Sequence, residues 1–342
     1  EVLVDDAYFD DRILPPAFEQ KPHDTSAYRA AVSAVSVEQN TYTLHVRPGL
    51  TAGSRAAVYL AVPGYFELDN QLITSAQVPS SVVAVQRPER GKLSLLLKGN
   101  VPLGARPLGY RRRVADPSSY AGFAMVEALR ELRISVPRLT RTGKTPTGAP
   151  LLASRCSPPL GEMLAELGKH SDNFTAEMLL KVLGAERVKR PGTSADGAKV
   201  ALNALGRMGV ETRKIAMVNG SGLFAGNLFT ASSLCRLLAA VYANATVRPD
   251  FLAQLAVGGV DGTLTRRLRD LPVPGVVRAK TGTLNQVISL SGYVLGPSPE
   301  RVIAFSFLAN DISGQKQAAR ALADGIVTAI ASHLWSTVTD EQ

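Results

Sequence analysis

Residues Gly275–Leu284 read Gly-Val-Val-Arg-Ala-Lys-Thr-Gly-Thr-Leu, and the pattern around this stretch decides the fold class. The run Gly275–Thr283 is strand-like, and two more strand-like runs follow it at Gln286–Leu295 and Arg301–Leu308. A run with helical spacing, Gln315–Leu334, comes next. Helical patterns before and after a short antiparallel sheet are typical of an α+β domain, so the sequence predicts that class.

A helical region precedes these strands, and a β-rich region precedes the helices. The candidate helices are Tyr120–Leu132, which starts at Asp116-Pro117, and Pro159–Leu167, Phe174–Leu183, Ala195–Met208 and Ala231–Tyr242. The candidate strands are Tyr42–Pro48, Ala56–Val62, Ser81–Val85 and Lys92–Leu97. A polar Gly/Thr/Pro stretch at Thr140–Pro150 separates the two regions, so we predict β-rich accessory domains over residues 1–145 and an α+β domain over 146–342.

The bulk composition is that of an ordinary globular protein. The 342 residues are 45% hydrophobic and 20% charged, and no apolar run approaches the length of a membrane-spanning helix. The formal net charge is +9, but the basic residues are spread out. The densest cluster, Arg111-Arg112-Arg113, is interpreted as a solvated loop because three basic residues make a poor nucleic-acid footprint. We therefore expect no membrane span and no nucleic-acid partner.

The sequence gives no pattern for a metal or a redox cofactor. Cys156 and Cys235 fit neither a zinc nor a Cys-x-x-Cys motif. We interpret them as buried free thiols, with a single disulfide left open. The histidines lack metal-ligand spacing, and they are His23, His45, His170 and His333. His170 adjoins Ser171, but adjacent residues at a helix start usually point apart, so a structural role is favoured.

Two short motifs carry chemistry. Ser171-Asp172-Asn173 stands directly before the helix-like run Phe174–Leu183, and Lys280-Thr281-Gly282 ends a strand-like run. Ser-Asp-Asn alone fits simple helix capping, and Lys-Thr-Gly alone is short enough to occur by chance. In this order and in these settings, the pair is part of the signature of serine β-lactamases and penicillin-binding proteins.

The residue types suit acyl transfer, which needs a nucleophile, a proton shuttle, an oxyanion hole and a grip on the substrate. A serine hydroxyl held near lysines, as for Ser171, can relay a proton to the leaving amine. Asn173 can form a hydrogen bond with the substrate's amide. Lys280 places a positive charge that attracts a carboxylate. We therefore interpret Ser171, Asn173 and Lys280 as catalytic residues.

The three residues that follow Lys280 suit peptide binding. The Thr281 hydroxyl can hold the C-terminal carboxylate of a peptide. Gly282 has no side chain, so an extended peptide can lie against this strand as an added strand. The backbone N–H of Thr283 can then face the developing oxyanion. We predict that all three bind substrate.

Over nearly its whole length the chain resembles the low-molecular-mass, class C penicillin-binding proteins, the D-alanyl-D-alanine carboxypeptidase/endopeptidase family. The stretches that match, in family order, are Val2–Phe9, Ala34–Thr41, Asp116–Ala121, Ser171–Asn173, Asn219–Leu223, Gly259–Leu264 and Lys280–Leu284. The resemblance implies a penicillin-recognising, β-lactamase/transpeptidase-like α+β domain interrupted by β-rich accessory domains. It also implies a serine-type peptidase that works without a metal, in the periplasm or elsewhere outside the cytoplasmic membrane. Such an enzyme removes the terminal D-Ala or cuts cross-bridges of peptidoglycan stem peptides through an acyl-serine, and β-lactam antibiotics acylate the same serine.

The chain departs from the family pattern at the nucleophile. The family carries its Ser-x-x-Lys before the accessory domains, whereas Glu1 opens a strand-like run here. The only Ser-x-x-Lys string, Ser313–Lys316, follows the last strand-like run and so stands in the wrong place in the order. We therefore expect the native protein to carry its nucleophile ahead of Glu1, and this chain alone not to acylate.

Four positions bear on the pocket for the third residue of the stem peptide. Family members that grip diaminopimelate have an Arg at the position of Ala225, and Gln or Met is common at the position of Asn285. Both departures predict an altered pocket. Asp5 and Phe9 match its other wall, so the resemblance implies that Asp5 binds substrate. The alternative is that Asp5 is a strand-end carboxylate without that role.

Three functions remain open on these residues. The leading hypothesis is the serine-type D-Ala-D-Ala peptidase. The second is a non-catalytic relative that binds cell-wall peptides and releases no D-Ala, which the absent nucleophile and Ala225 motivate. A β-lactamase or esterase is the third, but the long β-rich segment before Ser171 argues against it, because such hydrolases resemble the compact core alone.

Overall fold

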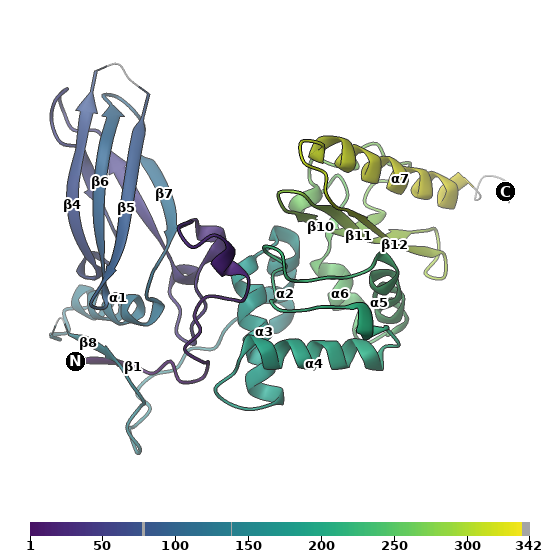
Figure 1. The fold of residues 1–342 in the computed structure, drawn as a ribbon, viewed down its shortest axis with the longest axis horizontal. Helices are drawn as coiled ribbons and strands as arrows, with labels where there is room; N and C mark the ends of the chain where they lie inside the picture. The colour runs from purple at the N-terminus through teal and green to yellow at the C-terminus, as the bar shows by residue number, and fades with distance from the viewer. Residues whose placement is uncertain (77–78, 138, 337–342) are drawn as a thin grey trace. The chain divides into compact units, whose positions relative to one another are not determined.

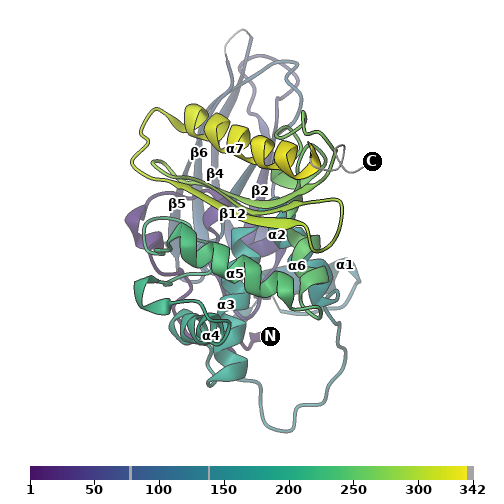
Figure 2. The same ribbon diagram turned by 90° about the vertical axis from the view of Figure 1, so that its right-hand side faces the viewer.

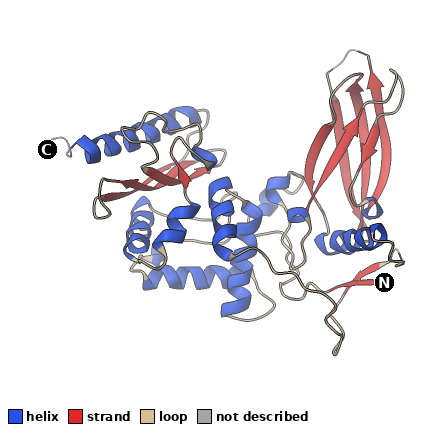
Figure 3. Cartoon of the chain, turned by 180° about the vertical axis from the view of Figure 1, so that it is seen from behind, coloured by secondary structure: helices blue, strands red, loops and turns tan. Residues whose placement is uncertain are grey.

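The computed structural model describes residues 1–76, 79–137 and 139–336, which form two compact units. Unit 1 comprises Glu1–Leu152 and Lys181–Ser194, and unit 2 comprises Ala153–Leu180 and Ala195–Gln342. Strands predominate in unit 1 and helices in unit 2 (Figure 3). The assignment of residues 1–145 and 146–342 to accessory and penicillin-recognising domains stays a prediction.

Among the described residues, unit 1 contains two three-stranded sheets, one complete α-helix and the last turns of a second (Figure 1). One sheet has the order β3-β2-β7, and the other has the order β4-β6-β5, in which β4 runs parallel to β6 and β5 antiparallel to it. The short strands β1 and β8 pair in parallel. The elements are β1 (Val2–Val4), β2 (Thr41–Arg47), β3 (Ala57–Tyr59), β4 (Phe66–Ser75), β5 (Ser81–Glu89), β6 (Lys92–Pro102), β7 (Leu108–Arg113), α1 (Pro117–Glu131) and β8 (Thr140–Thr142), with 3₁₀ turns at Phe18–Gln20, Ala27–Arg29, Glu38–Asn40 and Pro63–Tyr65.

Fully buried and less buried side chains alternate along the first part of β6, and this alternation explains how the core of unit 1 forms. Leu93, Leu95 and Leu97 are fully buried, because every second side chain of a strand points to the same face. Side chains of both three-stranded sheets join them in one apolar cluster. The helix α1 starts where the sequence predicts it. Asp116 caps it by accepting a hydrogen bond from the backbone N–H of Ser119 at 3.0 Å.

Unit 2 is an antiparallel four-stranded sheet, order β12-β11-β10-β9, between helices. The helix α7 lies along one face of the sheet and α5 along the other (Figure 2). Leu290 and Val294 of β11 are buried together with Ala323 and Val327 of α7. The elements are α2 (Leu160–His170), α3 (Asn173–Arg187, whose residues from Lys181 on belong to unit 1), α4 (Ser194–Arg207), α5 (Ala231–Ala243), α6 (Arg248–Gln254), β9 (Ala256–Val257), β10 (Val277–Thr283), β11 (Ile288–Leu295), β12 (Val302–Ala309) and α7 (Lys316–Ser336), with 3₁₀ turns at Thr212–Lys214 and Gly262–Leu264. The predicted α+β class is confirmed.

The interpretation of Arg111–Arg113 as a solvated loop is wrong. These residues end β7, which pairs with β2 in the register Thr41↔Arg113. The Nε of Arg111 also donates a hydrogen bond to Thr41 Oγ1 at 2.8 Å. The ladder with β2 satisfies the backbone, and the charged side chains can stay at the surface of a strand. The strand β4 was not predicted either, because acidic and amide side chains at Glu67, Asp69 and Gln71 hide its apolar positions.

Both cysteines are free, and Cys156 is exposed, so its interpretation as a buried thiol is wrong. Cys235 is half-buried, and this burial raises the pKa of its thiol. In residues 1–76, 79–137 and 139–336, no helix combines the length and the apolar character that crossing a bilayer requires.

Candidate active site

Ser171 lies in the short connection between α2 and α3. Its backbone is left-handed, with φ 57° and ψ 49°, and this conformation ends α2. Asp172 then starts α3, because its carboxylate accepts hydrogen bonds from the backbone N–H groups of Phe174 at 3.1 Å and Thr175 at 3.3 Å. The capping expected of this motif therefore exists. The cap belongs to Asp172, and the Ser171 side chain remains exposed.

Lys280 of β10 reaches the Ser171 hydroxyl. Its Nζ donates a hydrogen bond to Ser171 Oγ at 2.7 Å and another to the carbonyl of Thr281 at 2.8 Å. Burial lowers the pKa of Lys280 from 10.5 to about 8, because the ammonium loses water around it. At neutral pH most Lys280 side chains carry the proton. Neutral pH is nevertheless close enough to the pKa of about 8 for Lys280 to give this proton up. The structure thus brings the two predicted motifs together, although they lie 109 residues apart in the chain.

The hydroxyl of Thr281 is held in place from outside β10. It donates a hydrogen bond to Thr263 Oγ1 at 2.9 Å. The segment that carries Thr263 is tied in turn to α2, because Lys169 Nζ donates to Asp261 Oδ2 at 2.5 Å and to the carbonyl of Leu255 at 3.1 Å. The strand β10 is therefore linked to the α2 region in two ways. Lys280 contacts Ser171 at the end of α2 directly, and Thr281 contacts the segment of Thr263, which Lys169 of α2 holds.

One edge of β10 is open where the motif lies. The strand β9 pairs with Arg278 and Ala279 alone, whereas β11 pairs with the whole of β10. Within the described residues, the edge from Lys280 to Thr283 has no strand partner on the β9 side. Packing within the sheet also favours a glycine at position 282. A Cβ at Gly282 would stand 2.2 Å from the Oγ of Ser289, its cross-strand partner on β11.

Asn173 is the first residue of α3. The same helix carries a second important residue, Glu177, which the sequence patterns did not single out. Glu177, one turn further along α3, is only 1% exposed. It accepts hydrogen bonds from the backbone N–H groups of Gly220 at 2.9 Å and Ser221 at 2.8 Å, and from the Ser221 hydroxyl at 2.5 Å. The loop Asn219–Leu223 is thereby fixed against α3. The matched Asn-Gly-Ser-Gly-Leu stretch is a signal for the loop, but nothing local in the sequence points to Glu177.

Asp5 lies in unit 1. Its carboxylate accepts hydrogen bonds from the backbone N–H groups of Thr145 at 2.7 Å and Ala7 at 3.1 Å. The hydrogen bond from Thr145, followed by that from Ala7, lowers the pKa of the Asp5 carboxyl. Phe9 is buried, with 4% of its surface exposed. The predicted role of Asp5 in binding substrate stays a prediction.

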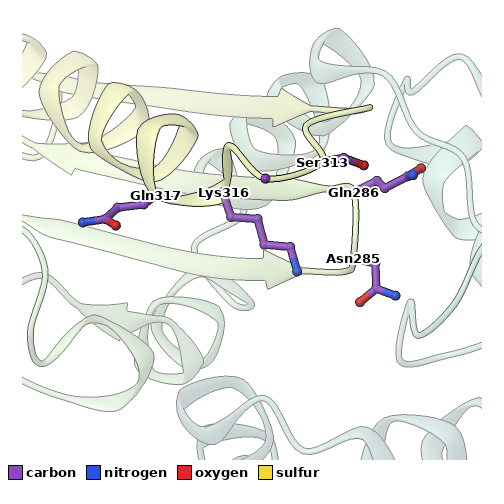
Figure 4. A pocket seen from close by; sticks show the side chains of 6 residues that line it. Asn285, Gln286, Ser313, Lys316 and Gln317 are labelled. Atoms are coloured by element: carbon purple, nitrogen blue, oxygen red, sulfur yellow. The ribbon is translucent and has the colours of Figure 1, made fainter.

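Three residues of the string Ser313–Lys316 line a pocket of about 540 Å³ beyond the end of β10, and they are Ser313, Gly314 and Lys316. Asn285, Gln286 and Gln317 also line it. Figure 4 shows the Lys316 side chain directed toward Asn285, whereas the Ser313 side chain points away from Lys316. Ser313 and Lys316 therefore do not form a serine–lysine pair. This agrees with their position in the sequence, after the last strand-like run, where the family does not carry its Ser-x-x-Lys.

The histidine next to Ser171 is engaged elsewhere. The Nε2 of His170 lies 3.5 Å from Glu166 Oε2, one turn back on α2, where both side chains are exposed. This agrees with a structural role for His170. Among the described residues, no group of three or more His, Cys, Asp or Glu side chains is placed to hold a metal ion.

The fold defines the class of protein first. Penicillin binding protein 4 (dacB) from Haemophilus influenzae superposes with a TM-score of 0.75 over 95% of this chain and 74% of that protein, at 21% sequence identity. The architecture is therefore the penicillin-recognising, β-lactamase/transpeptidase-like fold. Within this class, the chain belongs to the D-Ala-D-Ala carboxypeptidase 3 (S13) family, which it matches over residues 1–332.

The chain is also similar to two curated proteins. It is 35% identical to a D-alanyl-D-alanine carboxypeptidase of Actinomadura sp., over 97% of this chain and 63% of the relative. It is 28% identical to the D-alanyl-D-alanine carboxypeptidase DacB of Haemophilus influenzae, over 62% of this chain and 44% of the relative. The chain thus spans less than two thirds of the length of these relatives.

Proposed function

We propose that the native protein is a serine-type D-Ala-D-Ala carboxypeptidase/endopeptidase that acts on peptidoglycan stem peptides outside the cytoplasmic membrane. The observation that carries the proposal is the 2.7 Å hydrogen bond from Lys280 Nζ to Ser171 Oγ, next to the open edge of β10. Membership of the family and the names of the curated relatives support the same activity.

In this proposal Lys280 and Ser171 move a proton during acylation. The nucleophile is a serine of a Ser-x-x-Lys segment outside residues 1–342, because Ser313 and Lys316 point apart (Figure 4). When the serine oxygen bonds to the substrate carbonyl carbon and the C–N bond breaks, the leaving amine takes a proton from the Ser171 hydroxyl. The Lys280 ammonium replaces that proton through its hydrogen bond to Ser171. The nucleophilic serine gives its own proton to the lysine of its Ser-x-x-Lys segment, and this proton passes on to Lys280, which regains its charge. Water later hydrolyses the acyl-serine and frees the shortened peptide.

The substrate lies along the open edge of β10 as an added strand. Thr281 Oγ and the Lys280 ammonium bind the carboxylate of the terminal D-Ala, and the backbone N–H of Thr283 faces the scissile carbonyl. The carboxylate is therefore nearer the start of the motif and the scissile carbonyl nearer its end. This order makes the peptide antiparallel to β10. Asn173 forms a hydrogen bond with the substrate's amide.

Labelling with a fluorescent penicillin tests the proposal. The protein expressed from its intact natural gene is compared with the 342-residue chain. A labelled native protein beside an unlabelled chain supports the enzyme with its nucleophile outside this chain. If neither is labelled while both are folded, the catalytic proposal is wrong. The family member would then be a non-catalytic binder of cell-wall peptides, which binding of a stem peptide without release of D-Ala would establish.

A further inference from the structure

One side of the sheet β3-β2-β7 in unit 1 faces away from the core. Tyr42, Leu44 and Val46 of β2 are buried in the apolar cluster of this unit, whereas His45 and Arg47, which alternate with them, are exposed. We call this second side the outer face. Its exposed residues are His45, Arg47, Ala57, Tyr59, Gly109 and Arg111.

The outer face carries two permanent positive charges, on Arg47 and Arg111, and none of its exposed residues is acidic. In the ranges that the structure describes, neither arginine forms an ion pair. The guanidinium of Arg111 is also held in place. Its Nε donates a hydrogen bond to Thr41 Oγ1 at 2.8 Å, and NH2 donates one to Gln39 Oε1 at 2.9 Å. Both acceptors are neutral, so the charge of Arg111 is left for a partner.

The other three-stranded sheet of unit 1 differs in charge. The exposed side of β4-β6-β5 carries the carboxylates of Glu67 and Asp69 as well as the ammonium groups of Lys92 and Lys98, and Lys92 lies 3.8 Å from Glu67. The absence of acidic residues from the outer face is therefore a property of one sheet, and the basic composition of the whole chain does not explain it. Cations without acidic neighbours favour an anionic partner.

An aromatic ring lies between the two arginines. Tyr59 is 64% exposed, and its ring centroid is 6.0 Å from that of His45, its cross-strand partner on β2. Gly109 is the partner of His45 on β7, and a Cβ there would meet only Thr43 Cγ2, at 3.6 Å. The surface beside the two rings is therefore open. A tyrosine offers an apolar ring face and a hydroxyl, which match the C–H groups and hydroxyls of a sugar ring.

The register of the strands sets the spacing of the charges. Arg111 pairs with Thr43, and Arg47 lies four residues further along β2. A strand advances about 3.3 Å per residue, so the two arginines are about 13 Å apart along the sheet. His45 and its partner Tyr59 lie halfway between them. One carboxylate or phosphate is too small to reach both arginines, whereas an extended polymer with negative charges at intervals can do so.

We propose that the outer face binds a strand of peptidoglycan, with a sugar ring against Tyr59 and carboxylates of the stem peptides at Arg47 and Arg111. One polymer supplies both kinds of group, because its sugar chain carries peptides that end in carboxylates. The outer face then holds the protein on the polymer whose peptides the active site cuts. This inference rests on the proposed function for the choice of polymer, whereas the charge and the exposed ring are features of unit 1 itself.

Co-sedimentation of the complete protein with purified, insoluble peptidoglycan tests the inference. Benzylpenicillin is added first to block the proposed active site. Arg47→Gln removes a charge, Arg47→Lys keeps it, and Tyr59→Ala removes the ring. Lys98→Gln is the matched control, because Lys98 is an exposed cation on the other three-stranded sheet of unit 1. Immobilised polyphosphate serves as a second polymer, since it offers negative charge without sugar or peptide.

Arg47→Gln should weaken binding to peptidoglycan by about three- to fivefold, and Tyr59→Ala by about fivefold. Arg47→Lys should retain most of the affinity, and Lys98→Gln should leave it unchanged. Equal affinities for all variants, or a loss in Lys98→Gln as large as in Arg47→Gln, would overturn the inference. A loss in Arg47→Gln without one in Tyr59→Ala would do the same, because the site would then need no sugar.

The comparison of the two polymers uses the unaltered protein, so it does not depend on the folding of any variant. Binding should be tighter to peptidoglycan than to polyphosphate, and the opposite order would overturn the inference. Labelling of the complete protein by penicillin, with binding that is independent of Arg47 and Tyr59, overturns this inference alone. No labelling, with binding that depends on both residues, overturns the catalytic proposal and leaves the polymer site supported.

Discussion

The buried carboxylate of Glu177 binds Ser221 twice, accepting hydrogen bonds from its backbone N–H at 2.8 Å and from its hydroxyl at 2.5 Å. A third hydrogen bond comes from the backbone N–H of Gly220 at 2.9 Å. Since Glu177 is one turn from Asn173 on α3, the loop Asn219–Leu223 and the Ser-Asp-Asn motif share one rigid support. Glu177 thus acts as a positioning residue.

Glu177→Gln should destabilise unit 2. The variant loses the charge that two backbone N–H donors and a hydroxyl satisfy, and an unpaired buried donor costs about 2 kcal/mol. We expect the midpoint of thermal unfolding to fall by about 4–8 °C, measured by circular dichroism. Glu166→Gln is the matched control, because the Glu166 side chain is 79% exposed and its ion-pair partner, His170, belongs to the same helix. Equal midpoints for Glu177→Gln and the wild type would show that the loop does not depend on this carboxylate.

Lys280→Ala in the complete protein should slow acylation by labelled penicillin by about a hundredfold or more, in line with loss of an electrostatic or oxyanion-type contact. The measurement is the second-order rate of labelling. Lys199→Ala is the control, because the Lys199 side chain is 73% exposed and its ion-pair partner, Asp196 at 3.5 Å, belongs to the same helix. An unchanged rate in Lys280→Ala, with the protein folded, would refute the role assigned to Lys280.

The lowered pKa of Lys280 predicts how peptide turnover depends on pH. A group with a pKa of about 8 loses its charge as the pH rises through 8, so the ammonium that binds the substrate carboxylate disappears. We expect kcat/KM for a D-Ala-D-Ala peptide to fall about tenfold from pH 7 to pH 9. In Lys280→Arg the guanidinium keeps its charge over this range, so any residual activity should lose this fall. A rate that rises through pH 8 would instead mean that neutral Lys280 acts as a base.

The sequence predicts the pair Ser171 and Lys280 because each lies in a local pattern that folding preserves. A Ser-Asp-Asn before a helical run becomes a helix start, and a Lys-Thr-Gly that ends an apolar run becomes the end of β10. Residues fixed by such local rules keep their setting whatever surrounds them. The strands β10, β11 and β12 were predictable for the same reason.

The contacts that support the site were not predictable, because they join elements far apart in the chain. Glu177 looks like any polar residue of a helix until the loop at Ser221 meets it, 44 residues later. Asp261 likewise becomes structural only when Lys169 reaches it, across 92 residues. The spacing of apolar residues along the sequence carries no information about which distant residue a polar side chain will contact.

Gly282 offers a test that separates a structural from a functional requirement. A Cβ at this position would lie 2.2 Å from Ser289 Oγ but 3.5 Å from Ser289 Cβ, so only the hydroxyl obstructs it. Gly282→Ala should therefore lower the midpoint of thermal unfolding, and the double variant with Ser289→Ala should return it to that of Ser289→Ala alone. Alternate residues of a strand share a face, so the new methyl group also stands on the face of Lys280.

If an approaching substrate needs that space, acylation should remain at least about tenfold slower in the stable double variant than in Ser289→Ala. The comparison with Ser289→Ala removes any effect of the lost hydroxyl itself. Full recovery of both stability and acylation would show that Gly282 is required only by its neighbour on β11. Recovery of stability without recovery of acylation would assign the glycine to the passage of the peptide along β10.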